Sequence, residues 1–199
     1  MSDLVFRLIE WGGYFGVALL MFLETVFPPI PSEVIMPLAG VIAARGEMSL
    51  PIVIACGTAG AMLGNILWYV VAKLIGYERF EPLVRRFGRW LTLDWAEVER
   101  VHQLFDRHGT TIVFLGRMLP TVRSLVSIPA GLLRMSFWPF VIWSTIGSAI
   151  WTAGLAVAGY VLGQQFGEIE KVLGPVSLAV IVAIVIWYVW RVFTWKPAA

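Results

Sequence analysis

Charged residues are scarce in this chain, and cysteine and histidine are scarcer still. Only 14% of its 199 residues are charged, against roughly 25% in soluble domains, which excludes an ordinary soluble fold. The single cysteine, Cys56, rules out a disulfide bond within the chain. The two histidines, His102 and His108, have no cysteine cluster near them and make a poor metal site. No residue pattern points to a cofactor.

Apolar residues, in contrast, make up 59% of the chain, and its mean hydropathy is +0.81. This composition is typical of an integral membrane protein. Three segments, 48–72, 135–163 and 172–192, predict full transmembrane spans, since each reaches the ~20 residues that a helix needs to cross a bilayer. We therefore expect an all-α polytopic membrane protein, with residues 1–199 forming a single membrane domain.

Two further apolar segments, 11–44 and 110–133, are each broken near their middle by prolines and charged residues. The apolar run on either side of each break is too short to span a bilayer alone. Broken pairs at corresponding places in two halves of a chain indicate a transporter built from repeats, with its site at the breaks. The interrupting residues are Glu24, Pro28, Pro29, Pro31 and Glu33 in the first segment, and Arg117, Pro120 and Arg123 in the second.

An internal comparison supports the repeat. Residues 64–77 align with 147–160 at a shift of 83 positions. The shared residues are Gly64, Trp68, Gly76 and Tyr77 in the first half, and Gly147, Trp151, Gly159 and Tyr160 in the second. Upstream, at shifts of 91 to 93, Glu24, Pro37 and Gly40 fall opposite Arg117, Pro129 and Gly131. One half thus carries acids where the other carries arginines.

The distribution of basic residues predicts the topology. The loop 73–109 holds seven Lys or Arg residues, and more follow the last span, so this loop and the C-terminus are expected to be cytoplasmic. With these sides fixed, residues 110–133 must begin and end on the cytoplasmic side, so we expect a re-entrant hairpin that enters from the cytoplasm. By the repeat, residues 11–44 should form an inverted hairpin that enters from the outside. Within 77–109 we expect an amphipathic cytoplasmic helix. The side of residues 1–10 stays open.

Several motifs occur in a characteristic order: "LE…PPIPSE…P.AG", "GN..WY…G", "FDRHG" and "FLGRMLPTVRSLVSIPAGLLRMSFWPF". In this order, over about residues 14–165, the chain resembles the DedA family, the bacterial members of the VTT-domain (SNARE-associated Golgi protein) group. The resemblance implies an inner-membrane protein with two opposed re-entrant hairpins that moves lipids. It implies recycling of undecaprenyl phosphate, with dependence on the proton gradient in some members and phospholipid scrambling in eukaryotic relatives.

The family's functional acids correspond to Glu24 and Glu33, and its functional arginines to Arg117 and Arg123. An ionisable group at membrane depth costs at least ~2.5 kcal/mol, so it normally faces a partner, a cavity or a substrate path. Arginine suits a phosphate because it is permanently charged and donates two parallel hydrogen bonds. We expect the arginines to bind the head group and the acids to neutralise them or exchange protons. The expected lining of the same cavity is Asn65, Trp68, Pro120 and Trp151.

Other interpretations of these residues remain open. The charges could form only a structural ion pair, Glu33 could cap a helix, and Asn65 could join helices. A proton-coupled exporter of small cations or drugs could use the same acids, and a broad phospholipid scramblase or a homodimer is also compatible. An intramembrane enzyme would need a nucleophile or metal set; the sequence has no histidine at membrane depth and no Ser/His pairing, so we predict a transporter and not an enzyme.

Overall fold

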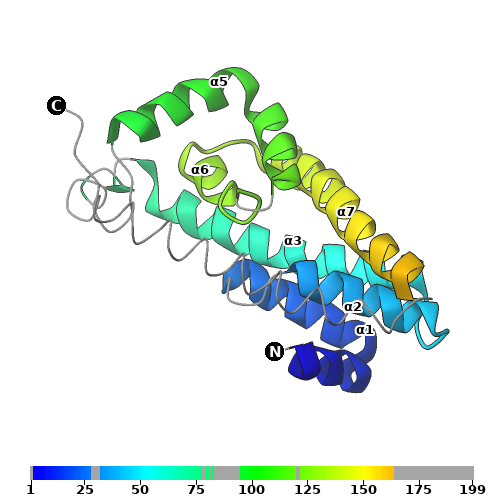
Figure 1. The fold of residues 1–199 in the computed structure, drawn as a ribbon. Helices are drawn as coiled ribbons and strands as arrows, with labels where there is room; N and C mark the ends of the chain where they lie inside the picture. Colours follow the sequence, from blue (N-terminus) through cyan, green and yellow to red (C-terminus); the bar gives the residue numbers. More distant parts are fainter. Residues whose placement is uncertain are drawn as a thin grey trace, which may run out of the picture.

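The computed structural model describes residues 2–27, 32–77, 79–80, 82, 95–119 and 122–163 (Figure 1). Its elements are, in chain order, α1 (Ser2–Val26), α2 (Ser32–Ala44), α3 (Leu50–Ile75), α5 (Trp95–Met118), α6 (Ser127–Leu132) and α7 (Phe137–Leu162). The described residues contain helices and no strand, which confirms the all-α prediction for this part of the chain.

Three described helices are long and apolar enough to cross a membrane: Val5–Val26 within α1, α3, and α7. Helices α3 and α7 correspond to the predicted spans 48–72 and 135–163. The third predicted span, 172–192, lies outside the described residues. The chain is therefore a membrane protein, with a candidate span in α1 that sequence reasoning assigned to a hairpin arm.

Helix α1 contains a kink at Gly13, where φ is 55° and ψ is −137°. Only glycine adopts this backbone conformation without strain. The kink leaves an arm from Tyr14 to Val26 of the same length as α2, which has 13 residues. At 1.5 Å per residue such an arm reaches about 20 Å, short of the ~30 Å hydrocarbon core. The re-entrant course of 11–44 stays a prediction, and its proline break at 28–31 lies outside the described residues.

Helix α5 joins two segments that were predicted separately. It runs from the amphipathic region 77–109 into the first arm of the hairpin 110–133, with non-helical torsions at His108 (φ −139°, ψ 27°). Figure 1 shows α5 bending there and descending toward α7. Turns at 122–126 then lead into the short helix α6.

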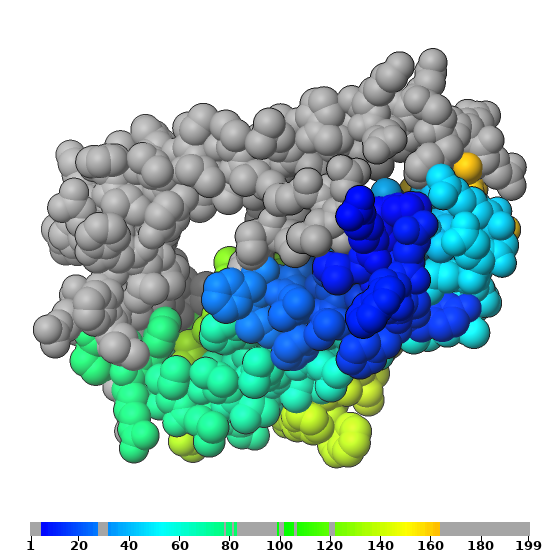
Figure 2. All heavy atoms as spheres, turned by 90° about the horizontal axis from the view of Figure 1, so that it is seen from below, coloured from blue at the N-terminus to red at the C-terminus, as the bar shows by residue number. Residues whose placement is uncertain are grey.

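The long helices α3 and α7 form the centre of the packing. Helix α1 packs on α3 and α5 packs on α7, whereas α2 crosses to α7 and α6 crosses to α3. Figure 2 shows α1, in blue, lying along the teal surface of α3. The pairs α1/α2 and α5/α6 therefore each touch both central helices, and the ends of α1 and α5 meet near the middle of α3 and α7.

Candidate functional site

A small cavity lies where these helix ends meet. Both predicted arginines line it, together with Glu24 from the end of α1, Asn65 from α3 and Trp151 from α7. The structure thus brings residues from both halves of the chain around one space. Pro120 lies outside the described residues.

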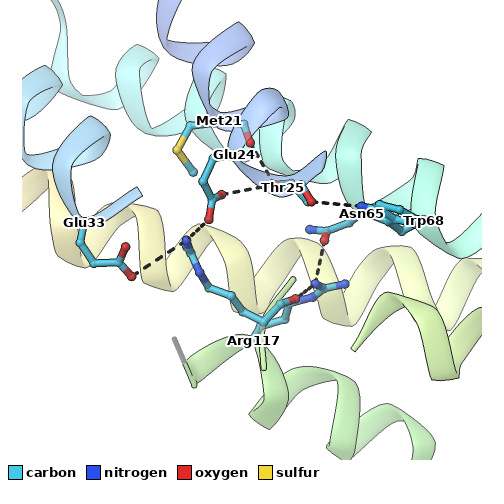
Figure 3. Close-up of polar contacts among 8 residues, drawn as sticks. Met21, Glu24, Thr25, Glu33, Asn65, Trp68 and Arg117 are labelled. Atoms are coloured by element: carbon cyan, nitrogen blue, oxygen red, sulfur yellow. Dashed lines mark hydrogen bonds and ion pairs between the residues drawn. The ribbon is translucent and has the colours of Figure 1, made fainter. Parts of the chain in front are cut away.

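Arg117 is 1% exposed and donates all five of its N–H groups to neutral acceptors. Figure 3 draws its contact with Asn65. Nη1 donates to Asn65 Oδ1 at 2.8 Å and to the Arg123 carbonyl oxygen. Nη2 donates to Ser127 Oγ at 2.8 Å and to Ser144 Oγ at 3.1 Å, and Nε donates to the same Ser144 hydroxyl at 3.4 Å. Within the described ranges, no carboxylate forms an ion pair with Arg117.

Arg123 has a different environment, because it faces both acids. Its Nη2 donates to Glu24 Oε1 and lies 4.0 Å from Glu33 Oε1. The side chains of Arg123 and Glu24 are 11% and 7% exposed, whereas that of Glu33, in the first turn of α2, is 38% exposed. Both predicted acids therefore lie against Arg123.

The carboxylate of Glu24 is held at the end of α1 by local contacts. The Thr25 hydroxyl lies 2.9 Å from the Met21 carbonyl oxygen and 3.4 Å from Glu24 Oε2. Trp68 Nε1 donates to the Thr25 carbonyl oxygen at 3.1 Å (Figure 3). This contact places the Trp68 indole on the backbone of α1, and Trp68 is not among the residues that line the cavity.

Sequence reasoning missed the hydroxyl side chains of the site. Ser144, Ser148 and Thr152 recur at four-residue intervals, so they lie on one face of α7, and all three are buried. Thr152 also exchanges a 2.8 Å hydrogen bond with Thr58 of α3. This spacing is a signal that the sequence contains, because three hydroxyls on one face of an apolar helix mark a polar stripe.

Comparisons with known proteins find one domain family and several relatives that match most of the chain. The VTT domain matches residues 30–161 of the chain. An "Alkaline phosphatase-like protein" of Lactococcus lactis subsp. lactis (strain IL1403) is 35% identical over 190 residues, 95% of this chain and 89% of that protein. "Undecaprenyl phosphate transporter A" of Staphylococcus aureus is 32% identical over 186 residues, 94% of this chain and 92% of that protein. The protein of the same name from Bacillus subtilis is 26% identical over 196 residues, 95% of each chain. No solved structure matches.

Proposed function

The chain belongs to the VTT-domain (DedA) family, and on that premise we propose that it is a translocase for an anionic lipid, with undecaprenyl phosphate as its substrate. Two similar proteins carry the name undecaprenyl phosphate transporter A and match nearly the whole chain. We place the protein in the bacterial cytoplasmic membrane, with the loop 73–109 and the C-terminus on the cytoplasmic side.

The observation that carries this proposal is the buried charge of Arg117. A buried cation normally has an anionic partner, because removal of a charge from water costs several kcal/mol. Arg117 has only neutral partners among the described residues, and it lines a cavity. Its positive charge therefore acts on the cavity and favours an anion there. The same positive charge would disfavour the binding of a cation, which a cation exporter requires.

The two arginines have different roles in the proposal. All five N–H groups of Arg117 are in use, so it supplies charge and, through the Arg123 carbonyl, fixes the turns at 122–126. Arg123 lies at the turn and touches the acids, so it is the residue that exchanges them for a phosphate. Arg123 binds the head group directly, and Arg117 is a positioning residue.

Glu24 and Glu33 neutralise Arg123 in the absence of substrate. An arriving phosphate competes with Glu24 for the guanidinium group. The displaced carboxylate would then be a buried, unpaired anion, which costs several kcal/mol unless it takes up a proton. Proton uptake at Glu24 on lipid binding is the route by which a proton gradient drives transport in this proposal.

The proposal includes an inverted repeat whose re-entrant hairpins are 11–44 and 110–133. It is supported by two equivalent close contacts. A Cβ atom on Gly64 would lie 2.7 Å from the Thr25 side chain and 3.3 Å from the Phe22 carbonyl oxygen. A Cβ atom on Gly147 would lie 2.7 Å from the Arg117 side chain and 3.3 Å from the Phe114 carbonyl oxygen. These matched distances make Thr25 of the first repeat the counterpart of Arg117 in the second. The acid that precedes Thr25 is therefore one residue out of register with Arg117.

The test is reconstitution in liposomes with labelled undecaprenyl phosphate. Wild-type protein should accelerate flipping above protein-free liposomes, and Arg123→Ala should abolish the gain. The matched control is Arg107→Ala, which removes an exposed arginine of α5 away from the cavity. Flipping equal to that of empty liposomes, or unchanged in Arg123→Ala, would refute the proposal.

Two additions to the same assay separate the alternatives. A proton gradient imposed across the liposomes should raise the rate of net transport if Glu24 couples it, and should leave a scramblase unaffected. Release of inorganic phosphate from the lipid would instead indicate a phosphatase, the activity contained in the name of the Lactococcus lactis relative.

A further inference from the structure

Two buried hydrogen-bond donors, on side chains that line the cavity, have no acceptor among the described residues. Among the buried side-chain polar atoms of the described residues, only Ser32 Oγ, Arg123 Nε and Trp151 Nε1 lack a partner. Arg123 and Trp151 both line the cavity, and the guanidinium carbon lies 5.7 Å from the centroid of the Trp151 ring. A buried donor without an acceptor costs about 1–3 kcal/mol, so two together are a sign of an absent partner.

The chemistry of the two donors defines that partner. An indole N–H and a guanidinium N–H can donate but cannot accept. The partner must therefore be an acceptor, and an anionic oxygen fits because it has no proton to place. A water molecule that accepted from both donors would also have to donate its own protons, and the acceptors that line the cavity include the Glu24 carboxylate.

The internal repeat supplies a comparison for Trp151. Its counterpart in the first half, Trp68, donates Nε1 to the Thr25 carbonyl oxygen at 3.1 Å and so ties α1 to α3. Trp151 occupies the equivalent place on α7 but has no such acceptor. The same side chain is thus used for structure in one half and leaves its donor unused in the other.

We infer that Trp151 is a direct ligand of the lipid's phosphate, donating its indole N–H to an oxygen that Arg123 Nε also binds. This inference rests on the proposed function and deepens it. Trp151 stands on the long helix α7, so its donor is fixed in space, whereas Arg123 lies in the turns at 122–126. The pair selects head groups that present acceptors and disfavours ammonium groups, which present only donors.

The test observes the indole N–H directly. Full-length protein labelled with ¹⁵N is titrated in detergent micelles with farnesyl phosphate, and with farnesol as the control that lacks phosphate. One of the ten tryptophan indole signals should shift with farnesyl phosphate alone. That signal should be absent in Trp151→Phe. Should this variant not fold, substitution of the other tryptophans in turn assigns the signal by exclusion.

Affinity provides the second measurement. Trp151→Phe keeps an aromatic ring and removes the donor, and it should bind farnesyl phosphate roughly 10- to 100-fold more weakly, since the lost bond goes to a charged group. Trp143→Phe is the matched control on the same helix; Trp143 is 40% exposed and contacts Phe114 instead of the cavity. Trp68→Phe should lower stability without this loss of affinity.

The outcomes separate the inference from the function on which it rests. Farnesyl phosphate that binds in an Arg123-dependent manner, with the Trp151 signal unmoved, would overturn the inference and leave the proposed function intact. An equal response to farnesol would also overturn it, because the chain and not the phosphate would then be recognised. If the wild-type protein neither binds farnesyl phosphate nor flips the lipid, both the inference and the proposed function are refuted.

Discussion

The substitution Asn65→Asp tests whether the charge of Arg117 attracts the lipid. Asn65 is 3% exposed, and its Oδ1 accepts from Arg117 Nη1 at 2.8 Å and lies 3.2 Å from Ser127 Oγ. Aspartate has nearly the same shape, so it keeps both contacts and turns the first into an ion pair. The fold should survive, because a buried ion pair with good geometry roughly balances its desolvation.

The substitution should, in contrast, strongly weaken the binding of an anion in the cavity. At an effective dielectric constant of 20, a new negative charge about 7 Å from a monoanion in the cavity costs ~2.4 kcal/mol. This energy corresponds to a roughly 50-fold loss of affinity, and a phosphate with two charges loses more. Asn65→Asp should therefore bind farnesyl phosphate at least tens of times more weakly while unfolding at a similar temperature.

The assay is the affinity for farnesyl phosphate in detergent, with flipping in liposomes beside it. Gln103→Glu is the matched control, because it makes the same change from amide to carboxylate at an exposed position of α5. It should leave both measurements unchanged. If Asn65→Asp is folded and binds and flips like wild type, Arg117 does not act through its charge and the reasoning is wrong.

Two further predictions concern the packing around the site. Gly147→Ala should destabilise the protein by about 1–3 kcal/mol and slow flipping, because its Cβ would lie 2.7 Å from the Arg117 side chain. The control is Gly154→Ala, whose Cβ would have no atom within 4 Å, and it should change neither stability nor flipping. Thermal unfolding and the flipping assay measure the two effects. Thr58→Val and Thr152→Val should each lower the free energy of unfolding by about 1 kcal/mol, and a double-mutant cycle should give a coupling energy of about 0.6 kcal/mol. If the two losses are additive, the 2.8 Å hydrogen bond between these side chains contributes nothing to stability.

The helices at the centre of the fold were predictable because their signal is local. Helices α3 and α7 each contain a long uncharged run, whose length identifies them as span candidates. The extent of α1 was not predictable, because Asp3, Arg7 and Glu10 interrupt its apolar pattern. The helix nevertheless begins at Ser2 and continues through a kink at Gly13, a position where glycine permits both a turn and a helix.

The charged residues that the structure brings together could be picked out from the sequence, but their pairing could not. Charges at membrane depth identified both arginines and both acids, since such residues are costly unless they have a use. Which arginine meets the acids depends on the turns at 122–126, where Arg117 binds the carbonyl of Arg123. The neutral partners of Arg117 come from α3, α6 and α7; the spacing of the hydroxyls on α7 marks a polar stripe, but it does not say that Arg117 binds there.

The division of partners between the arginines explains how the site could both attract a lipid and release it. If each acid paired with one arginine, an arriving phosphate would have to displace a carboxylate from each guanidinium group. Because Glu24 and Glu33 both lie at Arg123, only one guanidinium group exchanges partners, and the positive charge of Arg117 stays fixed by neutral dipoles throughout. Attraction then comes from Arg117 and release from the return of Glu24 to Arg123, so the two steps can be changed by separate substitutions.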